Sequence, residues 1–446
     1  MGPFSNDSPI TFQDGVPEAV DALVIGAGVV GTSTAYFLAK QGLKVALCEK
    51  GRVAGEQSSR NWGWIRQQGR DPAELPIMIE SNRIWRGLAA ETSEADLNFR
   101  MCGCVYLADD KAALAKYEQW HDLARQHQLD TRMLSAAEAK SMVGDFSGEW
   151  VGGMVTPSDG CAEPFVAVPA LARAAQASGA RVIENCAVRT VETEAGRVTS
   201  VTTEQGTIKT SLVLLAGGAW SSMFAANLGL ELPQLAVRST VGRTHVAKSF
   251  DLPNLSAKGL SLRERADGGY TVTSGDLAEH YIGPQSFKYL TKFMPVLRGA
   301  AKDMHMKLSA PADYPNTWSG RRRWSGTEES PFERMRVLNP EPSPVVMERV
   351  RERLPKQAPW LNDAGMLEFW AGMIDVTPDA VPYLCAAPGY EGLFIATGMS
   401  GHGFGIGPGV GRLMADMMRG VPHGFDLRRF RFDRFTDGSK IVPGPY

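Results

Sequence analysis

The sequence of 446 residues lacks a long apolar run and any strong excess of charge of one sign. No apolar stretch reaches the roughly 18 residues that a membrane-spanning helix needs. The 47 basic and 49 acidic residues give a formal net charge of −2, so the charge balance points to neither nucleic acid nor an anionic membrane as a partner. We expect a soluble globular protein with one large or two medium domains.

Cysteine is scarce, and its spacing excludes two common uses. The six cysteines form no CxxC pair and no metal-ligand spacing with histidine, so we expect no metal site. Cys102 and Cys104 are too close for an easy disulfide, and we expect reduced or buried thiols, as in a cytoplasmic protein. Residues 1–18 lack the basic start and apolar core of a signal peptide and are expected to form a loose N-terminal tail.

A glycine-rich motif follows the first predicted strand, residues 22–25. A helix continues from the motif, and the next strand ends in an acid. The four key positions are Gly26, Gly28, Gly31 and Glu49. In this order the glycines permit a tight turn, a close approach to a pyrophosphate, and close packing of helix on strand, while the acid accepts hydrogen bonds from ribose hydroxyls. The helix N-terminus offers free N–H groups to the anion. The motif predicts a dinucleotide site and leaves NAD and FAD open.

Hydrophobic periodicity divides the rest of the chain into parts of different character. Helices are predicted at 76–89, 111–127, 136–142 and 164–178. Strands are predicted at 180–189, at 191–203 with a turn at 194–197, and at 207–215. From about residue 232 to 355 the pattern changes to short strands separated by turns, at 235–246, 259–265 and 270–274, with a helix at 287–297. This is typical of an antiparallel sheet with helices, inserted between two parallel-sheet parts.

Every second residue from 401 to 411 is glycine. Such a run is too rich in glycine for a stable helix or strand, so we expect a helix only after it, at 412–419. Something must approach this backbone closely, with a flexible hinge as the alternative.

Four motifs in order resemble one family, the FAD-dependent D-amino-acid oxidase superfamily with glycine, sarcosine and γ-glutamylputrescine oxidases. Besides the first glycine motif, they are AGGAWS at 216–221, TPD at 377–379 and GHGF at 401–404. The resemblance implies an α/β fold, in which an FAD-binding Rossmann-like domain of the GR2 type carries an inserted antiparallel α+β substrate domain. The implied boundaries are 19–95, 150–228 and 365–435 for the FAD-binding domain, 96–149 and 229–364 for the substrate domain, and 1–18 and 436–446 for the tails.

The segment Ser58-Ser59-Arg60-Asn61-Trp62-Gly63 is similar to a loop of γ-glutamylputrescine oxidases and sarcosine oxidase β subunits, which implies that it covers the flavin. Its hydroxyls and arginine suit a pyrophosphate. The cofactor contacts implied in this way are Gly26, Gly28, Val30, Gly31, Glu49, Lys50, Ser58, Ser59, Arg60, Asn61, Val188, Ala216, Gly217, Trp220, Gly372, Gly401, His402, Gly403, Phe404 and Gly405.

The catalytic candidates are Arg66 and His402. The resemblance implies that Arg66 pairs with a substrate carboxylate, for which a bidentate guanidinium is suited, although it could instead stack on a tryptophan. We expect His402 to be an electrostatic neighbour of the flavin rather than a base. Substrate-wall candidates are Trp62, Trp64, Tyr270 and Trp370, of which Trp370 is the one most easily explained by core packing.

Departures from the family pattern matter for function. Gly405 replaces the lysine of sarcosine oxidases, and Gly372 replaces the cysteine that tethers flavin, so FAD should be bound noncovalently. No lysine lies between Lys258 and Lys288, which leaves oxygen or another electron acceptor open.

The resemblance implies oxidation of the C–N bond of an amine or amino acid, a secondary or N-substituted amine being favoured, by hydride transfer to flavin N5 and hydrolysis of the imine. Two alternatives remain: a D-amino-acid or cyclic imino-acid dehydrogenase, and a flavoprotein subunit of a sarcosine-oxidase-like heteromer. An NAD-dependent dehydrogenase is disfavoured by the C-terminal GHGF motif. Homo- and hetero-oligomers both stay open.

Overall fold

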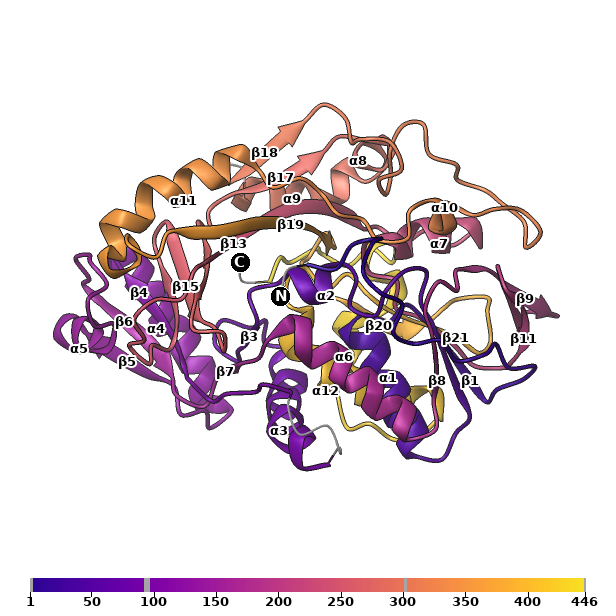
Figure 1. The fold of residues 1–446 in the computed structure, drawn as a ribbon. Coiled ribbons are helices and arrows are strands. Elements are labelled where there is room, and N and C mark those ends of the chain that lie inside the picture. Colours follow the sequence, from indigo (N-terminus) through magenta and orange to yellow (C-terminus); the bar gives the residue numbers. More distant parts are fainter. Residues whose placement is uncertain (1–2, 92–96, 301–302, 445–446) are drawn as a thin grey trace.

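One half of the molecule is built on a six-stranded sheet with the strand order β20-β21-β12-β1-β2-β8 (Figure 1). The computed structural model describes residues 3–91, 97–300 and 303–444. Neighbouring strands are parallel except β20 and β21, which are antiparallel. The strands are β1 (Ala22–Ile25), β2 (Val45–Cys48), β8 (Arg181–Ile183), β12 (Val213–Leu215), β20 (Tyr383–Ala386) and β21 (Leu393–Thr397). Segments from the start, middle and end of the chain therefore meet in one sheet.

Helices cover one face of this sheet, and a small sheet covers the other. Side chains of β1 alternate between two cores, because Ala22 and Val24 pack with the helices while Leu23 and Ile25 pack on the opposite side. The helical side holds α1 (Val29–Lys40), α6 (Pro164–Ala177), α12 (Gly403–Met418) and α3 (Leu75–Glu91). The opposite side holds β9 (Val188–Glu194), β10 (Arg197–Thr203), β11 (Gly206–Lys209) and α7 (Ser221–Asn227).

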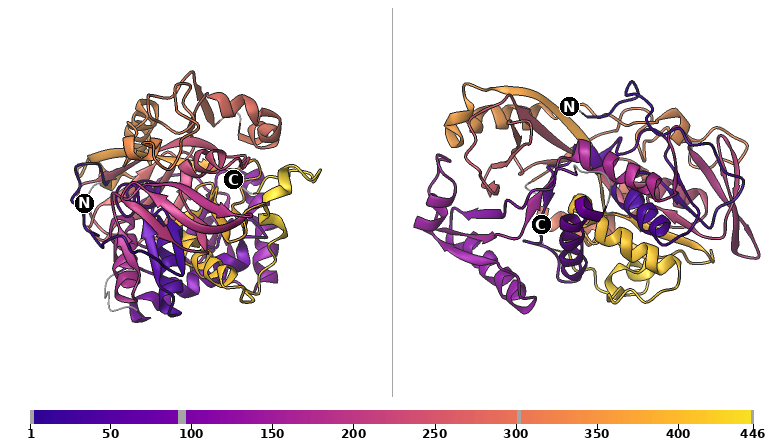
Figure 2. Two further views of the ribbon diagram at one scale, coloured as in Figure 1. Left: turned by 90° about the vertical axis from the view of Figure 1, so that its right-hand side faces the viewer. Right: turned by 60° about the horizontal axis from the view of Figure 1, so that its bottom comes forward.

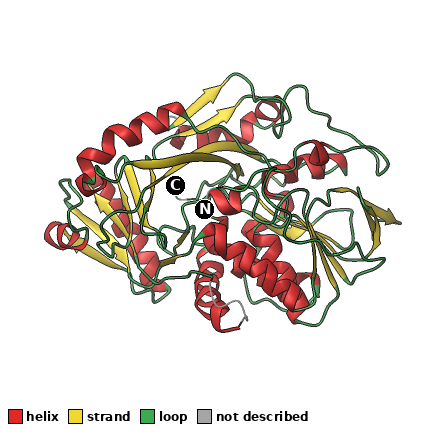
Figure 3. Ribbon diagram, viewed as in Figure 1, coloured by secondary structure: helices red, strands yellow, loops and turns green. Residues whose placement is uncertain are grey.

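A ten-stranded sheet of mixed direction forms the other half (Figure 3). Its longest pairing is antiparallel, between β13 and β19. The strands are β4 (Cys104–Ala108), β5 (Arg132–Ser135), β6 (Gly152–Thr156), β13 (Leu235–Thr244), β14 (Asn254–Ala257), β15 (Leu260–Glu264), β16 (Tyr270–Thr273), β17 (Ala278–Tyr281), β18 (Met304–Lys307) and β19 (Met366–Val376). Figures 1 and 2 show the strands β4 to β6 and the small sheet β9 to β11 at opposite ends of the molecule.

Further helices and short elements complete the fold. The helices are α2 (Gln57–Arg60), α4 (Lys111–Gln126), α5 (Ala136–Met142), α8 (Pro284–Lys288), α9 (Leu290–Ala300), α10 (Pro331–Arg334) and α11 (Pro344–Gln357), and a two-stranded sheet pairs β3 (Trp64–Ile65) with β7 (Gly160–Cys161). Among the described residues, no helix is long and apolar enough to cross a membrane.

Most predicted elements are present, although the strand predicted at 180–189 ends with β8 at Ile183 and β9 begins only at Val188. Two further elements are broken where the sequence suggested one. The strand predicted at 207–215 divides into β11 and β12, which belong to different sheets. The helix predicted at 287–297 divides at Tyr289 into α8 and α9. Both breaks follow from tertiary packing, since residues 210–212 turn between two sheets and the Tyr289 side chain is buried under β13 and β19.

The predicted domain boundaries differ from the strand pairing at two places. The segment 150–228 begins with β6 and the segment 365–435 begins with β19, yet both strands belong to the ten-stranded sheet. Hydrophobic patterns identify a strand but not its partners, so a boundary placed by residue number falls one strand early. The boundary at 95/96 lies outside the described residues.

The glycine run at 401–411 is the largest departure from the sequence prediction. We expected a helix only after it, but α12 begins at Gly403 and includes the run. A Cβ at Gly407 would lie 2.6 Å from the side chain of Val29 in α1, and one at Gly409 would lie 2.5 Å from a backbone oxygen of α3. The low helix propensity of glycine is overcome because two helices pack directly against this backbone.

The N-terminal tail, expected to be loose, is packed against the first sheet in its described part. Phe12 is buried, and the backbone N–H groups of Thr11 and Phe12 donate to the carboxylate of Glu184 at 2.6 and 3.2 Å. Asp14 accepts the N–H of Val182, in the edge strand β8, at 2.8 Å. An apolar side chain and satisfied backbone groups therefore order a segment that composition alone describes as a tail.

Candidate functional site

A first cavity lies where the β1–α1 turn, the α2 loop and the start of α12 meet. It encloses about 1220 Å³ up to its open mouth. Residues near both ends of the sequence line it, from Ile25 to Phe404. The predicted cofactor contacts that line it are Gly26, Gly28, Val30, Glu49, Lys50, Ser58, Asn61, Val188, Ala216, Gly217, Trp220, Gly401, Gly403 and Phe404.

The β1–α1 turn has no room for side chains at two of its glycines. Gly26 has φ +98°, and a Cβ there would lie 2.7 Å from the carbonyl oxygen of Ala216. A Cβ at Gly31 would lie 1.9 Å from the carbonyl oxygen of Gly26. Gly31 therefore packs the helix on the turn, as expected, without lining the cavity. The start of α1 faces the cavity, where its N–H groups favour an anion.

Glu49 stands at the edge of this turn with its carboxylate fixed by the backbone. Its two oxygens accept the N–H groups of Ala27 and Gly51, each at 2.8 Å. Burial raises the pKa of Glu49, and the two backbone donors and Lys50 oppose this shift. The remaining lone pairs of the carboxylate can accept ribose hydroxyls, as the motif predicts.

The segment 58–61 supplies two cavity residues and one structural arginine. The Ser58 hydroxyl accepts the Val29 N–H at 2.9 Å and thereby connects the loop to the start of α1. Arg60 is fully buried and donates to carbonyl oxygens of Phe4, Gly55 and Ala371 and to Asn339. These contacts occupy its two Nη atoms, whereas its Nε has no hydrogen-bond partner among the described residues. Its role as a pyrophosphate donor stays a prediction.

Lys50, Glu56 and Trp220 close one end of the first cavity. The Lys50 ammonium lies 2.6 Å from the Glu56 carboxylate and 4.5 Å from the centre of the Trp220 ring. Trp220 donates its indole N–H to the same carboxylate at 2.9 Å. This cluster gives the cavity a charged but internally compensated wall.

A second, larger cavity of about 2230 Å³, counted with its open mouth, adjoins the first. Gln57, Asn61, Gly401 and Phe404 line both cavities. The walls of the second are aromatic and cationic, formed by Trp62, Trp64, Tyr106, Tyr117, Trp120, Arg60, Arg66, Arg70 and Lys116. No Asp or Glu is among its described lining residues. His402 and Gly405, predicted as cofactor contacts, line this cavity and not the first.

Two arginines of the second cavity have different surroundings. Arg66 stacks over Tyr106, with its guanidinium carbon 5.8 Å from the ring centre, and donates to the carbonyl of Gln68. The sequence left open that Arg66 stacks on a tryptophan, and in the structure it stacks on Tyr106. Arg70 is enclosed and donates to the carbonyl oxygens of Arg66 at 3.0 Å and His402 at 3.4 Å. Arg70 thus holds Arg66 against the start of α12.

His402 is the residue immediately before α12, and its ring is held by a buried carboxylate. Its Nδ1 lies 3.2 Å from Oε2 of Glu74, which is itself buried. Burial, reinforced by the nearby Arg70, lowers the pKa of His402 to about 4 despite the opposing effect of Glu74. The ring is neutral at physiological pH, and the Glu74 contact places its proton on Nδ1.

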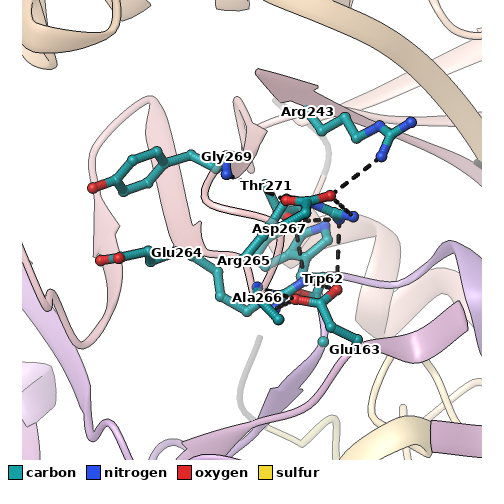
Figure 4. Close-up of polar contacts among 12 residues, drawn as sticks. Trp62, Glu163, Arg243, Glu264, Arg265, Ala266, Asp267, Gly269 and Thr271 are labelled. Carbon is teal, nitrogen blue, oxygen red and sulfur yellow. Dashed lines mark hydrogen bonds and ion pairs between the residues drawn. The ribbon is translucent and has the colours of Figure 1, made fainter. Parts of the chain in front are cut away.

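The loop that carries Trp62 is fixed by a buried ion-pair network (Figure 4). Arg263 donates from Nε to the Trp62 carbonyl at 2.6 Å and from Nη1 to Glu163 at 2.7 Å. Glu163 also contacts Arg265, which pairs with Asp267. Because Arg263 opposes the effect of burial, the pKa of Glu163 falls to about 2. Trp62 therefore has a rigid backbone at the cavity wall.

Two predicted wall residues lie elsewhere. Tyr270 is buried in the ten-stranded sheet, where its hydroxyl donates to the Lys248 carbonyl at 2.9 Å. Trp370 packs against Phe165 and donates to the Arg60 carbonyl at 3.0 Å. Neither is among the residues that line the two cavities. Strand periodicity shows that a residue is buried, but not that it faces a ligand.

Three of the predicted cofactor contacts support the first cavity from outside. Gly31 packs on the turn, and Ser59 is fully buried with its hydroxyl donating to Glu56. A Cβ at Gly372 would lie 2.1 Å from Oε1 of Gln57, so this glycine gives room for a cavity residue.

Sequence reasoning missed Gln57, Arg70 and Asp375. Asp375 lines the first cavity, and its Oδ2 accepts the N–H groups of Gly398 at 2.6 Å and Met399 at 3.2 Å, which fixes the turn before α12. Its only signal is its position two residues before TPD. The acid of TPD itself, Asp379, is bound by Arg434 and is structural.

Comparison with known proteins identifies the family. The model of FAD-dependent oxidoreductases called DAO matches residues 21–417. The chain belongs to the DAO family of FAD-dependent oxidoreductases. The predicted family, fold class and cofactor are confirmed, and the protein is an FAD-dependent enzyme.

Relatives within the DAO family act on several substrates. The structure of L-amino acid deaminase from Proteus myxofaciens, in complex with anthranilate, is similar with a TM-score of 0.90 and 30% identity over 96% of each chain. Glycine oxidase of Bacillus subtilis is 26% identical over 93% of this chain and 97% of its own. Sarcosine dehydrogenase of Homo sapiens is 25% identical over 96% of this chain, which spans only 43% of that protein's length.

The first cavity fits FAD on several independent points. Its wall includes bare glycine backbone, as at Gly26, where a Cβ would clash with the carbonyl of Ala216. The N-termini of α1 and α12 also face it. Glu49 stands where a ribose acceptor is needed, and the cavity continues to Gly401 and Phe404, next to the aromatic second cavity. The residues that would hold the nucleotide end are those of the β1–α1 turn and Glu49, and those that would adjoin the reactive ring are at the start of α12.

Proposed function

We propose that this enzyme oxidises the C–N bond of an α-amino acid, free or N-substituted. FAD, when bound, supplies the two-electron chemistry. The observation that supports an acid rather than a simple amine is the second cavity, which has four cationic residues and no Asp or Glu among its described lining residues. Such a field attracts a carboxylate and repels a polyamine.

Arg66 is the proposed partner of the substrate carboxylate. It lines the cavity, its stacking on Tyr106 fixes its plane, and Arg70 holds its backbone. A planar guanidinium offers the two parallel donors that a carboxylate accepts. Arg70 is a positioning residue, because its contacts are to the protein itself.

The aromatic walls favour a substrate with a bulky apolar group. Trp62 and Trp64 meet edge to face with their ring centres 5.2 Å apart. The ring centres of Tyr106 and Tyr117, which also line the cavity, lie 5.8 Å apart. Rings of this kind bind apolar and aromatic groups by area and by offset contacts. The Proteus deaminase that resembles this chain holds the aromatic acid anthranilate.

The remaining site residues exclude a strong base and stabilise negative charge. His402 has its Nδ1 proton occupied by Glu74, and its ring stays neutral. An amine that enters neutral needs no protein base, only correct orientation. The first N–H groups of α12 have no partner within the helix and can stabilise negative charge that develops nearby.

Two features of the proposal concern the cofactor and the electron acceptor. Gly372, whose Cβ position is filled by Gln57, supports noncovalent FAD. The acceptor stays open between oxygen and another oxidant, because relatives include both a glycine oxidase and a D-amino acid dehydrogenase.

A subunit role is the second candidate function, since a sarcosine oxidase subunit beta is 27% identical over 89% of its length. The cytoplasmic location and the oligomeric state stay predictions.

The test is anaerobic bleaching of the flavin by a panel of amino acids and amines, followed by the variant Arg66→Met. We expect acids with apolar side groups to bleach the flavin and amines without a carboxylate to fail. In the variant, KM for the best acid and Kd for anthranilate should rise about 10- to 100-fold, the value of one lost charged hydrogen-bond pair.

Lys116→Met is the matched control, because it removes a positive charge from the outer wall of the same cavity, where Lys116 is exposed. It should change KM by less than about threefold. Bleaching by amines alone, or equal effects of the two variants, would contradict the proposal. Oxygen uptake compared with dye reduction on the same substrate separates oxidase from dehydrogenase.

A further inference from the structure

Two cysteines outside both cavities face each other. Cys102 and Cys161 are 59 residues apart in sequence, and their Sγ atoms are 3.5 Å apart, the Cys102 thiol donating a hydrogen bond to the Cys161 sulfur. A disulfide bond would require about 1.5 Å of further approach. Neither residue lines either cavity.

The backbone holds the two thiols in this position. Arg100, two residues before Cys102, exchanges both backbone hydrogen bonds with Cys161, at 2.8 and 2.9 Å. The N–H of Gly103 donates to the Asp159 carbonyl at 2.8 Å. Because paired backbone flanks both cysteines, their approach is a property of the fold rather than of two free side chains.

The surroundings give the two sulfurs different chemical states. The hydrogen bond from Cys102, together with Arg263 and Arg100, lowers the pKa of Cys161 to about 6 against the effect of burial. The same hydrogen bond and burial raise the pKa of Cys102. The shared hydrogen bond and the two arginines thus favour negative charge on Cys161 and a proton on Cys102, which is the arrangement of an attacking and a resolving cysteine.

We infer that Cys102 and Cys161 form a dithiol that hydrogen peroxide oxidises to a disulfide. The Cys161 thiolate attacks one peroxide oxygen, the O–O bond breaks, and hydroxide leaves, which gives Cys161 sulfenic acid. Cys102 then attacks that sulfur, the S–O bond breaks, and water leaves with the Cys102 proton. The released hydroxide takes up a proton from solvent, so peroxide is reduced to two waters while the two sulfurs together lose two electrons. Cys102 is half-buried, whereas Cys161 is buried behind it.

The disulfide would connect segments that form the substrate side of the molecule. Cys102 precedes β4 by two residues, and Cys161 lies in β7, directly opposite Trp64 of β3. The bond would thus join the segment that leads into β4 of the ten-stranded sheet with the β3–β7 strand pair. That pair carries Trp64, which lines the second cavity. A crosslink between residues so distant in sequence restricts the unfolded chain, so the melting temperature should rise by a few degrees on oxidation.

The test treats the reduced holoenzyme with hydrogen peroxide, then blocks free thiols in denaturant and maps tryptic peptides without reductant. We expect peptide 101–111 joined to peptide 141–173 with the loss of two hydrogen atoms. Cys102→Ser should abolish the joined peptide and leave Cys161 as a sulfenic acid that dimedone labels. Cys104→Ser is the matched control, since Cys104 lies in the same tryptic peptide but is buried in β4, and it should leave the joined peptide intact.

Several outcomes would overturn the inference. Free alkylated thiols at both positions after peroxide treatment would do so, as would a joined peptide that depends on Cys104. Wild type and Cys102→Ser could also consume peroxide equally while dimedone fails to label Cys161 in the variant. That result would exclude Cys161 as the attacking cysteine. Because the readout is covalent mapping, the result does not depend on the amino-acid substrate.

Discussion

His402, the residue before α12, illustrates how one buried side chain links the site to stability. Its ring lies between the Glu74 carboxylate and the Arg70 guanidinium, and its pKa of about 4 is well below the ordinary histidine value. The unfolded chain takes up a proton on this histidine near pH 6.5, whereas the folded protein takes it up only near pH 4. The free energy of unfolding therefore decreases as the pH falls through this range.

The expected result is a loss of folding stability that grows as the pH falls from about 6.5 to 4 and amounts to about 3 kcal/mol for this residue. In His402→Asn, which cannot titrate, the difference in unfolding free energy between pH 7 and pH 4 should be smaller by that amount. Urea unfolding across the pH range measures it. A direct NMR titration of the His402 ring with a midpoint above 6 would contradict the assignment.

At the residue scale, the sequence predicted which residues line the first cavity better than what each side chain does there. Most predicted contacts line the first cavity because the glycine motifs carry their own geometry. For Arg60, the motif shows that an arginine is present but not that the carbonyl groups of Phe4 and Ala371, far away in sequence, accept N–H groups of its guanidinium. Arg70 was missed for the same reason, because its partners come from folding.

At the element scale, α12 shows tertiary packing overriding propensity. Glycines disfavour a helix by about 1 kcal/mol each, which is why we expected none across the run. In the structure the glycines at 407 and 411 face α1, and those at 405 and 409 face β3 and α3. The spacing of four within each pair was a readable signal, because small residues one helical turn apart form a groove for a second helix.

Gly411→Ala tests this account. A Cβ at this position would lie 2.3 Å from the Ser33 Cβ and 2.7 Å from its backbone carbon. Although alanine favours the helix, this overpacking should lower the stability by about 1–3 kcal/mol. Thermal melting of purified protein measures the change.

Gly299→Ala supplies the control, because Gly299 lies in α9 and no atom is within 4 Å of its Cβ position. It should raise the stability by up to about 1 kcal/mol through propensity alone. An equal change in melting temperature in the two variants would show that close packing of α1 on α12 does not require glycine at position 411.

At the scale of the whole molecule, the two cavities are built from different kinds of information. The first is formed by motifs from both ends of the chain, at the turn after β1 and at the start of α12, and the order of motifs predicted that they meet. The second takes Tyr106 from β4 and Trp120 from α4. Periodicity predicted α4, but which of its faces lines the second cavity depends on how the two halves of the molecule pack together.

The Glu163 carboxylate connects the two halves of the molecule. It lies at the start of α6, which packs on the first sheet, and pairs with Arg263 and Arg265 of the second. All three side chains are buried. In Glu163→Gln the two arginines lose their shared counter-charge, so folding should be weakened by about 3–5 kcal/mol. Arg263 should also hold the Trp62 carbonyl less firmly, which raises KM for the substrate more than it lowers kcat.

Asp267→Asn is the matched comparison, since it also removes a carboxylate that contacts Arg265 but keeps the contact within the second half (Figure 4). Its side chain is 44% exposed, so the loss should be about 1 kcal/mol or less. Thermal melting and steady-state kinetics on both variants separate the effects. If the two substitutions weaken folding equally and leave KM unchanged, the Glu163 network does not position Trp62, because Glu163 contacts Arg263 and Asp267 contacts Arg265 instead.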